Sequence, residues 1–319
     1  MPLPTGDTIG ILTDNLRLRR SVLPIPVESA IRWTKGLELP RGGERVLYTG
    51  LMYQLIPYIE DLVEAQTKLG DSWLAGFIGV GRQVNKLINV AAFMAHPSQE
   101  EQQSYDRIPR NVALLLKRAG VQFGALYEDD LYSGALAFDL GADEALRAHA
   151  QKVYAAIKKH GVQELITIDP HTTNMLRSVY PTLIDGYDLT VRNYLEVLAE
   201  AEMVPRHQIA GDVAIHDSCV FARYEGVQAQ PRLLLEGAGL TLCEPHHTGT
   251  FTWCCGGPAE SLFPQKAAEQ AGRRVAELQA VANSGVTMCP LCYVNLQKAA
   301  GDAMRFDDIS DYLLRAYQD

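Results

Sequence analysis

The sequence predicts an α/β fold in which two tandem units each hold a short parallel sheet flanked by helices, with candidate ligands at one edge of the sheet. Short, wholly apolar segments alternate with amphipathic helical segments, a pattern typical of parallel sheets connected by helices. Matching features also recur at nearly constant spacing: Gly134 precedes Gly256 by 122 positions and Pro170 precedes Pro290 by 120. A chain of 319 residues with 47% hydrophobic residues is long enough for two such units.

The first unit is expected at residues 46–198, after an N-terminal extension at 1–45. The segments 46–48 and 165–168 are short and apolar, as buried parallel strands are. Residues 143–160 repeat apolar side chains at helical spacing, which predicts an amphipathic helix. Its apolar face consists of Leu146, Ala150, Val153, Ala156 and Ile157.

Residues 70–112 are interpreted as an insertion in the first unit. They include an apolar segment that starts at Trp73 and is interrupted by Arg82 and Lys86. These charges argue against a membrane span and favour an amphipathic helix that contacts a partner, or an ordinary buried helix.

The second unit is expected at residues 199–319. A strand is predicted at 213–215, and a helix at 264–282. The apolar face of that helix consists of Ala268, Ala271, Val275 and Leu278. Both units are expected to close with a helix led by an aromatic residue, at 187–198 and 306–314.

The cysteines are confined to the second unit. All six lie between Cys219 and Cys292, and the first 218 residues contain none. Five of them form one pattern, in which 34 residues separate Cys219 from the adjacent pair Cys254-Cys255. A further 33 residues separate that pair from the C-x-x-C segment that starts at Cys289.

The five thiols are expected to converge at one edge of the second sheet, because Cys219 and Cys289 each follow a predicted strand. Soft thiolates suit zinc or an iron–sulfur cluster. Zinc usually takes four ligands and the pattern offers five, which favours the cluster and leaves zinc as the main alternative. Two weaker hypotheses are thiols that only fill a core, as at Cys243, and a disulfide framework.

Three segments resemble one protein family, and they are I-H-D-S-C-V-F-A-R-Y-E-G-V at 215–227, W-C-C-G-G-P at 253–258 and M-C-P-L-C-Y-V-N-L at 288–296. They are similar to the cysteine-rich CCG domain of the B-type and D-type subunits of heterodisulfide reductase, of the iron–sulfur subunit of glycolate oxidase and of lactate-utilisation proteins. The resemblance is specific over 211–319 and weaker over 44–198. Ser218 and Ala222 stand where the family usually has proline and glycine, and neither change removes a ligand.

This resemblance implies a [4Fe-4S] cluster of the noncubane type, and the implied ligands are Cys219, Cys254, Cys255, Cys289 and Cys292. It implies an iron–sulfur subunit of a heterodisulfide-reductase-like complex, such as that of sulfur oxidisers, with redox chemistry on a disulfide, a thiol or a sulfur-carrier protein. The implied partners are a ferredoxin-like iron–sulfur subunit and a flavoprotein subunit, because one cluster alone cannot carry electrons far. The alternatives are an electron-transfer subunit of a glycolate- or lactate-type 2-hydroxy-acid oxidase and a zinc-stabilised scaffold without enzymatic activity.

Three residues near the pattern are candidates for catalytic roles. His216 precedes Cys219 closely enough to orient a thiolate or supply a proton. His247 lies in the loop before the adjacent cysteines and is a candidate proton donor to a leaving thiolate. Cys243 is a candidate acceptor of a persulfide or a mixed disulfide. Each also has an ordinary explanation, respectively turn geometry, an exposed loop position and a buried inert thiol.

The first unit lacks cysteines at the matching positions, which are occupied by Leu51, Tyr132, Ser133, Asp169 and Thr172. Because iron–sulfur clusters need thiolates, this unit is expected to be a structural lobe without a cluster. An oxygen-ligated metal is the alternative there.

Charge and hydropathy exclude several classes of protein. A formal net charge of −9 and a pI near 5.4 argue against a nucleic-acid-binding surface. No stretch reaches the about 18 uninterrupted apolar residues that a membrane span needs. Arg19-Arg20 is not followed by an apolar run, so an export signal is not expected, and free thiols suit the reducing cytoplasm.

Overall fold

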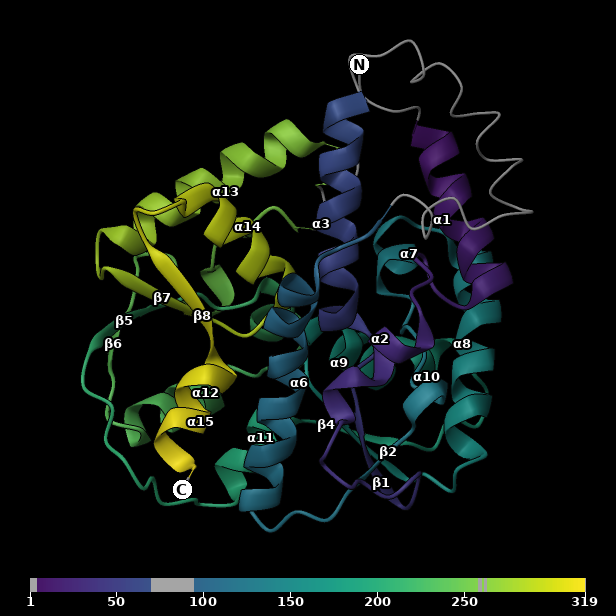
Figure 1. Ribbon diagram of the computed structural model, residues 1–319, viewed down its shortest axis with the longest axis horizontal. Coiled ribbons are helices and arrows are strands. Elements are labelled where there is room, and N and C mark those ends of the chain that lie inside the picture. The colour runs from purple at the N-terminus through teal and green to yellow at the C-terminus, as the bar shows by residue number, and fades with distance from the viewer. Residues whose placement is uncertain (1–4, 70–94, 258–259, 261–262, 319) are drawn as a thin grey trace.

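The computed structural model describes residues 5–69, 95–257, 260 and 263–318. It contains two parallel sheets of four strands each, flanked by helices (Figure 1). The predicted fold class, two tandem α/β units, is therefore confirmed.

The two sheets have the same strand order. The first sheet consists of β1 (Arg45–Tyr48), β2 (Gly124–Ala125), β3 (Glu164–Thr167) and β4 (Thr190–Asn193), in the order β2-β1-β3-β4. The second consists of β5 (Asp212–Ile215), β6 (Thr241–Cys243), β7 (Ser284–Thr287) and β8 (Arg305–Asp308), in the order β6-β5-β7-β8. All neighbouring strands are parallel, so in each sheet the first and third strands in sequence are central and end at the same edge.

Helices connect the strands. Those up to β5 are α1 (Thr5–Arg19), α2 (Val27–Ile31), η1 (Arg32–Thr34), α3 (Met52–Leu69), α6 (Gln99–Arg118), η3 (Tyr127–Asp129), α7 (Ala135–Asp139), α8 (Asp143–Lys158), α9 (Pro170–Asn174), η4 (Met175–Val179), α10 (Tyr180–Leu183) and α11 (Tyr194–Glu200). Those after β5 are η5 (Phe221–Glu225), α12 (Ala229–Gly237), η6 (Gly249–Phe251), α13 (Pro264–Gln279), α14 (Pro290–Ala300) and α15 (Ile309–Tyr317).

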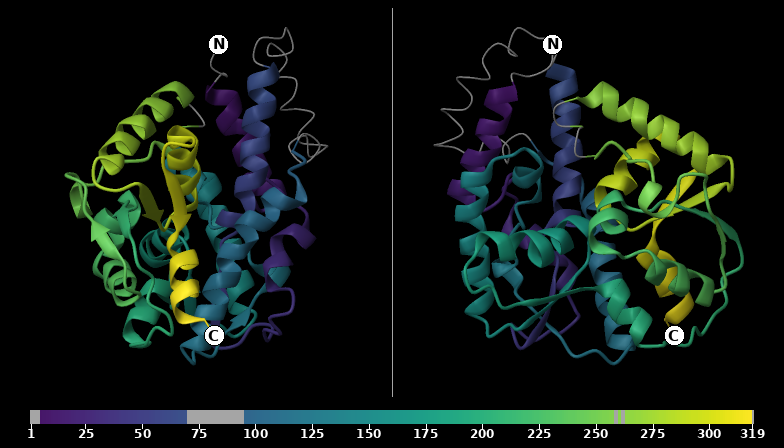
Figure 2. Two further views of the ribbon diagram at one scale, coloured as in Figure 1. Left: turned by 60° about the vertical axis from the view of Figure 1, so that its left-hand side comes forward. Right: turned by 180° about the vertical axis from the view of Figure 1, so that it is seen from behind.

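Helices α3 and α6 lie between the two units (Figures 1 and 2). Helix α6 packs against α11 and α15, and α3 packs against α14. One buried core cluster contains Leu47 and Ile166 of the first sheet together with Val213 and Val286 of the second. The two units therefore share a hydrophobic core, and burial of apolar surface holds them against each other.

The two closing helices begin later than predicted. The chain first forms the edge strands β4 and β8, and only then do α11 and α15 begin. Each strand ends in a residue whose side chain, Asn193 or Asp308, accepts a hydrogen bond from the backbone N–H two residues on. The helices predicted at 187–198 and 306–314 are therefore wrong in their first residues, because pairing with β3 and β7 keeps the chain extended there.

The helices predicted at 143–160 and 264–282 are both present in the structure. Helix α8 confirms the helix predicted at 143–160. Helix α13 confirms most of the one predicted at 264–282, but Ala267 is buried where Ala268 was expected, and Ala268 is exposed. The buried positions 267, 271, 275 and 278 follow the spacing of one helical face, and position 268 lies about 100° away from it.

The predicted insertion is described only in part. Residues 70–94, which include Trp73, Arg82 and Lys86, lie outside the described residues, so the docking helix predicted there stays a prediction. Residues 95–98 lead into α6, and 99–112 belong to this helix, whose first turn is closed by a capping box between Ser98 and Glu101. Within the described ranges, no helix combines the length and apolarity needed to cross a bilayer.

Candidate metal centre

Three of the five patterned cysteines follow the carboxyl ends of the two central strands of the second sheet, and the other two lie in a loop. Cys219 follows β5, and Cys289 follows β7 as the N-cap of α14. Pro290 occupies the first helical position, which suits its fixed backbone angle, and Cys292 follows in the first turn. Cys254 and Cys255 lie in the loop before α13.

The five thiol side chains interact with one another in a row. Cys219 and Cys255 both contact Cys254, Cys255 also contacts Cys292, and Cys292 contacts Cys289. Cys255, Cys289 and Cys292 are buried, whereas Cys219 and Cys254 are half-buried, and all six cysteines of the chain are free thiols. The structure thus brings together the five positions that the sequence pattern singled out.

Two of the thiols are set to ionise first. Hydrogen bonds from Cys219 and Cys255 lower the pKa of Cys254 to about 2. Burial opposes ionisation of Cys289, yet hydrogen bonds from Cys292 and His171 hold its pKa well below the ordinary value. The backbone N–H of Gly256 also donates to the Cys254 sulfur at 3.3 Å. Thiolates are the form that binds metals.

His216 adjoins this row of thiols. It is fully buried, and one of its ring nitrogens lies within 4.8 Å of the sulfurs of Cys255 and Cys292. Its Nδ1 accepts a hydrogen bond from Nε of Arg274 at 3.0 Å, so Nε2 carries the ring proton and has no partner among the described atoms. Burial, followed by the charge of Arg274, lowers the pKa of His216 to about 3. A neutral ring suits the predicted orienting role better than supply of a proton by a charged imidazole.

His171 is a residue of the site that the sequence pattern did not predict. It belongs to the first unit, as the second residue of α9, and is buried. Its imidazole interacts with the thiol of Cys289 in the second unit. Burial disfavours its charged form, but the contact with Cys289 outweighs burial and raises the pKa of His171 to about 9. The only sequence signal was that Asp169-Pro-His-Thr172 matches the C-P-L-C segment in position.

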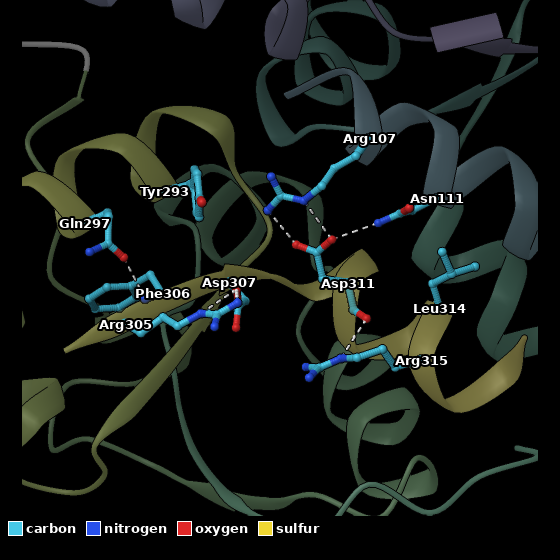
Figure 3. A pocket seen from close by; sticks show the side chains of 10 residues that line it. All are labelled: Arg107, Asn111, Tyr293, Gln297, Arg305, Phe306, Asp307, Asp311, Leu314 and Arg315. Atoms are coloured by element: carbon cyan, nitrogen blue, oxygen red, sulfur yellow. Dashed lines mark hydrogen bonds and ion pairs between the residues drawn. The ribbon is translucent and has the colours of Figure 1, made fainter. Parts of the chain in front are cut away.

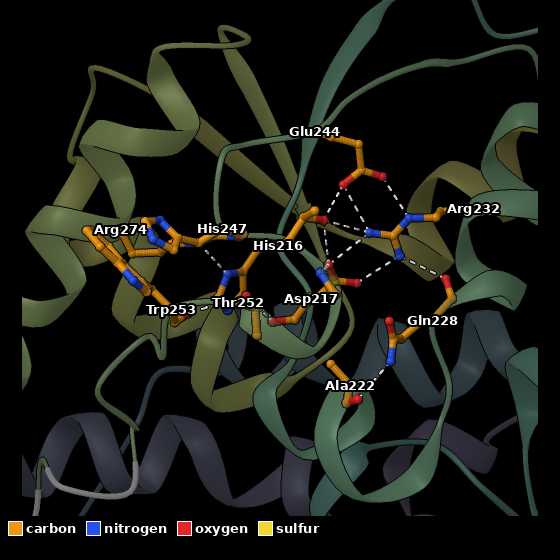
Figure 4. A network of polar contacts seen from close by, with 12 residues as sticks. His216, Asp217, Ala222, Gln228, Arg232, Glu244, His247, Thr252, Trp253 and Arg274 are labelled. Atoms are coloured by element: carbon orange, nitrogen blue, oxygen red, sulfur yellow. Dashed lines mark hydrogen bonds and ion pairs between the residues drawn. The ribbon is translucent and has the colours of Figure 1, made fainter.

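A polar network fixes the loops that carry the cysteines (Figure 4). The Asp217 carboxylate, two residues before Cys219, accepts hydrogen bonds from both Nη atoms of Arg232. The same carboxylate accepts from the backbone N–H of Gly249 at 2.7 Å. The hydroxyl of Thr252 donates to the Asp217 carbonyl at 3.1 Å. The turn around Cys219 is thereby tied to the loop that leads into the adjacent cysteines.

Gly256 fits a backbone position that other residues cannot occupy. Its φ of +83° lies in the left-handed region, and a Cβ there would come 2.6 Å from the carbonyl oxygen of Ala267. Its counterpart Gly134 has a φ of +87°, so the two units share this turn.

The remaining two catalytic candidates stay predictions. His247 stacks on Trp253 with ring centroids 4.1 Å apart, and its Nδ1 lies 2.7 Å from a carboxylate oxygen of Glu277. Cys243 is half-buried at the end of edge strand β6, opposite Ala214, and is not among the five interacting thiols.

The first unit places oxygen atoms and one apolar side chain at the matching positions. Leu51 is buried and offers no ligand atom, and the Tyr132 hydroxyl accepts a hydrogen bond from the backbone of Leu136. Asp169 caps α9 through one oxygen, which accepts from the N–H of Thr172 at 2.9 Å. The predicted absence of a cluster in this unit rests on these residue types.

A separate pocket of about 500 Å³ lies beside α6, α14, β8 and α15 (Figure 3). Four of its charged side chains form two pairs: Arg107 binds Asp311 with two hydrogen bonds, and Arg305 binds Asp307. None of the patterned cysteines lines it, so the metal centre is a different site.

Comparison with known proteins gives the same location for the site. Residues 213–297 match the cysteine-rich domain named CCG. The chain is 29% identical over 233 residues to the probable iron-sulfur-binding oxidoreductase FadF of Bacillus subtilis, a match that covers 67% of this chain and 32% of that protein. It is 27% identical to the EtfAB:quinone oxidoreductase of Syntrophomonas wolfei, with the same coverage.

A third relative is the B subunit of the fumarate reductase (CoM/CoB) of Methanothermobacter marburgensis, 29% identical over 169 residues, which cover 50% of this chain and 33% of that protein. The chain thus spans about a third of the length of these relatives. The match includes all five patterned cysteines within one domain. Residues 213–297 are a cysteine-rich CCG domain.

Proposed function

We propose that the chain is an iron–sulfur electron-transfer component of an oxidoreductase. The observation that carries this proposal is the row of five adjoining thiols, of which three follow β5 and β7 and two lie in the loop before α13. Relatives named as an iron-sulfur-binding oxidoreductase and as part of a fumarate reductase support it.

The donor set fits an iron–sulfur cluster. The residues that would hold it are Cys219, Cys254, Cys255, Cys289 and Cys292, and the cluster would supply one-electron transfer. Five thiols exceed the four ligands of a structural zinc site, which favours a noncubane [4Fe-4S] cluster over zinc. The backbone N–H of Gly256 donates to the Cys254 sulfur and would stabilise its negative charge.

The finer proposal concerns sulfur chemistry. The chain would act within a heterodisulfide-reductase-like complex on a disulfide, a thiol or a sulfur-carrier protein. A ferredoxin-like subunit and a flavoprotein would exchange electrons with it. The relative from the fumarate reductase (CoM/CoB) supports this version. In this proposal residues 199–319 bind the cluster, 46–198 form a related unit without cysteines, and 1–45 are an extension.

A second candidate is an electron relay that has no substrate of its own. The relative named EtfAB:quinone oxidoreductase, which matches over more of the chain than the fumarate reductase protein does, favours this version. The two versions differ in whether a disulfide reacts at the metal centre.

The test of the cluster is anoxic purification with analysis of iron, sulfide and zinc, followed by electron paramagnetic resonance. We expect about four iron and four sulfide per chain. Stoichiometric zinc without iron after attempted reconstitution would contradict the cluster and leave a zinc-stabilised scaffold.

The two versions are separated by adding a small-molecule heterodisulfide to the protein under reducing and oxidising conditions. A new paramagnetic signal that appears only with the disulfide supports sulfur chemistry. An unchanged spectrum, together with reversible reduction of the cluster, supports the electron relay.

A further inference from the structure

We propose that the pocket between the two units binds a small organic anion, and that the carboxylate or phosphate group of this ligand is held by Arg315. The pocket, of about 500 Å³, is lined by α6 of the first unit and by α14, β8 and α15 of the second (Figure 3). Small-molecule sites typically measure about 300–1,000 Å³ and favour boundaries between units. The inference goes beyond the proposed function and does not rest on it.

The charged side chains of the pocket have a positive sum. They are three arginines and two aspartates, namely Arg107, Arg305, Arg315, Asp307 and Asp311. The lining therefore carries a net charge of +1, although the whole chain carries a formal net charge of −9. A positive pocket in an acidic protein favours a negatively charged ligand.

The Asp311 carboxylate is neutralised within the wall of the pocket. It accepts hydrogen bonds from Nε and Nη2 of Arg107 at 3.0 and 2.8 Å. The side-chain amide of Asn111 donates to the same carboxylate at 2.9 Å. Because these donors balance its charge, Asp311 does little to repel an anion.

Arg315 is held in place with part of its guanidinium unused. Its Nε donates to the Asp311 carbonyl at 3.3 Å, and its guanidinium carbon lies 4.6 Å from the ring centroid of Tyr312. Stacking on the ring occupies the face of the guanidinium and leaves the donors at its edge available. Arg315 forms no ion pair with any residue that the structure describes. Its two Nη groups can therefore hold a carboxylate or phosphate with two parallel hydrogen bonds.

Arg305 brings a second guanidinium to the same pocket. Its Nε and Nη2 both donate to one oxygen of Asp307, at 3.1 and 2.8 Å, so Nη1 is left over. Arg305 extends from β8 and Arg315 from α15, and the two side chains point toward one another (Figure 3). The charged group of a ligand held by Arg315 would thus also face Arg305.

An apolar part of the lining favours an organic ligand over a bare ion. It consists of Tyr293, Phe306 and Leu314. Because one water molecule takes up about 30 Å³ in the liquid, a bare phosphate ion would leave most of the pocket to solvent. A ligand with an apolar body would fill this space and cover the apolar side chains.

The experiment measures the binding of three probes to the full chain, purified without oxygen, by isothermal titration calorimetry at constant chloride concentration. Phenylacetate and phenyl phosphate carry the two candidate charged groups on the same ring, and inorganic phosphate has no apolar body. Arg315→Gln removes the charge, and Arg315→Lys keeps the charge without the planar fork. Arg273→Gln is the matched control, because Arg273 is an exposed arginine of the second unit that does not line the pocket.

We expect saturable binding of phenylacetate, phenyl phosphate or both, and weaker binding of inorganic phosphate. The organic probe that binds more tightly identifies the charged group. Arg315→Gln should weaken binding about tenfold or more, because hydrogen bonds to a charged group contribute at least that factor. Arg315→Lys should lose part of the affinity, and Arg273→Gln should match the wild type. Urea unfolding checks that each variant is folded, and Arg305→Gln takes the place of Arg315→Gln if the latter is not.

Absence of saturable binding of both organic probes to the wild type would overturn the inference. Equal affinities in the wild type and Arg315→Gln would also overturn it. Equal losses in Arg315→Gln and Arg273→Gln would do the same, because they would report the overall charge of the protein alone. None of these outcomes involves the thiols, so the proposed function would stand.

Discussion

The carboxylate of Asp217 and the guanidinium of Arg232 form a two-pronged pair, with Nη to oxygen distances of 2.9 and 2.8 Å. The Asp217 side chain is 2% exposed, and that of Arg232 is 22% exposed. Burial disfavours the ionised carboxylate, yet hydrogen bonds from Arg232 hold the pKa of Asp217 below its ordinary value. Ionisation of Asp217 therefore depends on this partner.

Removal of the Arg232 side chain should lower the stability of the fold strongly. Arg232→Ala leaves Asp217 buried without its counter-ion, and we expect a loss of about 3–5 kcal/mol in the free energy of unfolding. The measurement is urea unfolding at pH 7. Arg41→Ala is the control, because Arg41 makes a similar two-pronged pair with Glu128 at the surface, where solvent screens the pair and its loss changes stability little. Similar losses in the two variants would contradict the prediction.

Gly256→Ala should disrupt the metal centre. The new Cβ would lie 2.6 Å from the carbonyl oxygen of Ala267 at a left-handed φ, so the turn after the adjacent cysteines must move. We expect the variant to lose most of its iron, measured per folded chain.

Gly272→Ala is the matched control for this change. Gly272 lies inside α13, and a Cβ there meets nothing within 4 Å. Alanine should stabilise the helix by about 0.5–1 kcal/mol and leave the iron content unchanged. Normal iron in Gly256→Ala would show that the turn tolerates a side chain.

The cysteines should fall into two groups on replacement by alanine. We expect replacement of Cys254, Cys255, Cys289 or Cys292 to abolish or strongly alter the cluster signal. Cys243→Ala should keep it, because Cys243 lies on edge strand β6 outside the row of thiols. Loss of iron in Cys243→Ala with retention in Cys219→Ala would reverse the assignment of the first ligand.

His149 should make the protein sensitive to acid. Burial lowers its pKa from 6.5 to about 4 despite the hydrogen bond to the Tyr132 carbonyl. The unfolded chain therefore binds a proton below about pH 6.5, and the folded chain does so only below about pH 4. This contribution to stability is full above pH 6.5 and is lost as the pH falls toward 4.

Because of this pKa difference, the free energy of unfolding should be lower at pH 4 than at pH 7 by on the order of 3 kcal/mol. Comparing urea unfolding of the wild type and His149→Gln at pH 7, 5.5 and 4 measures it. We expect the two curves of stability against pH to converge toward acid. Parallel curves would show that His149 titrates alike in both states.

The central strands and the gathering of thiols could be predicted from the sequence, because both follow from local patterns along the chain. Strands β1, β3 and β5 each contain a short, buried apolar run, β7 is buried after its first residue, and parallel strands end at one edge. The strands β2 and β6 were missed because two or three residues show no periodicity. The strands β4 and β8 were predicted as helix because an amphipathic helix follows each directly.

His171 was missed for a different reason. Its partner Cys289 lies 118 positions away in the second unit, and spacing within one unit says nothing about contacts between units. The match in position between Asp169 and Cys289 relates residues within each unit and carries no information about side chains at the boundary between the units.

The repeated strand order has a consequence for how such a centre can vary. Two identical subunits in a symmetric pair must present the same residues on both sides of their contact. Joining the two units in a single polypeptide removes that constraint, so Cys289 and Asp169 can differ although they follow equivalent strands. Substitutions on one side need not be mirrored on the other, and the two halves are free to specialise separately.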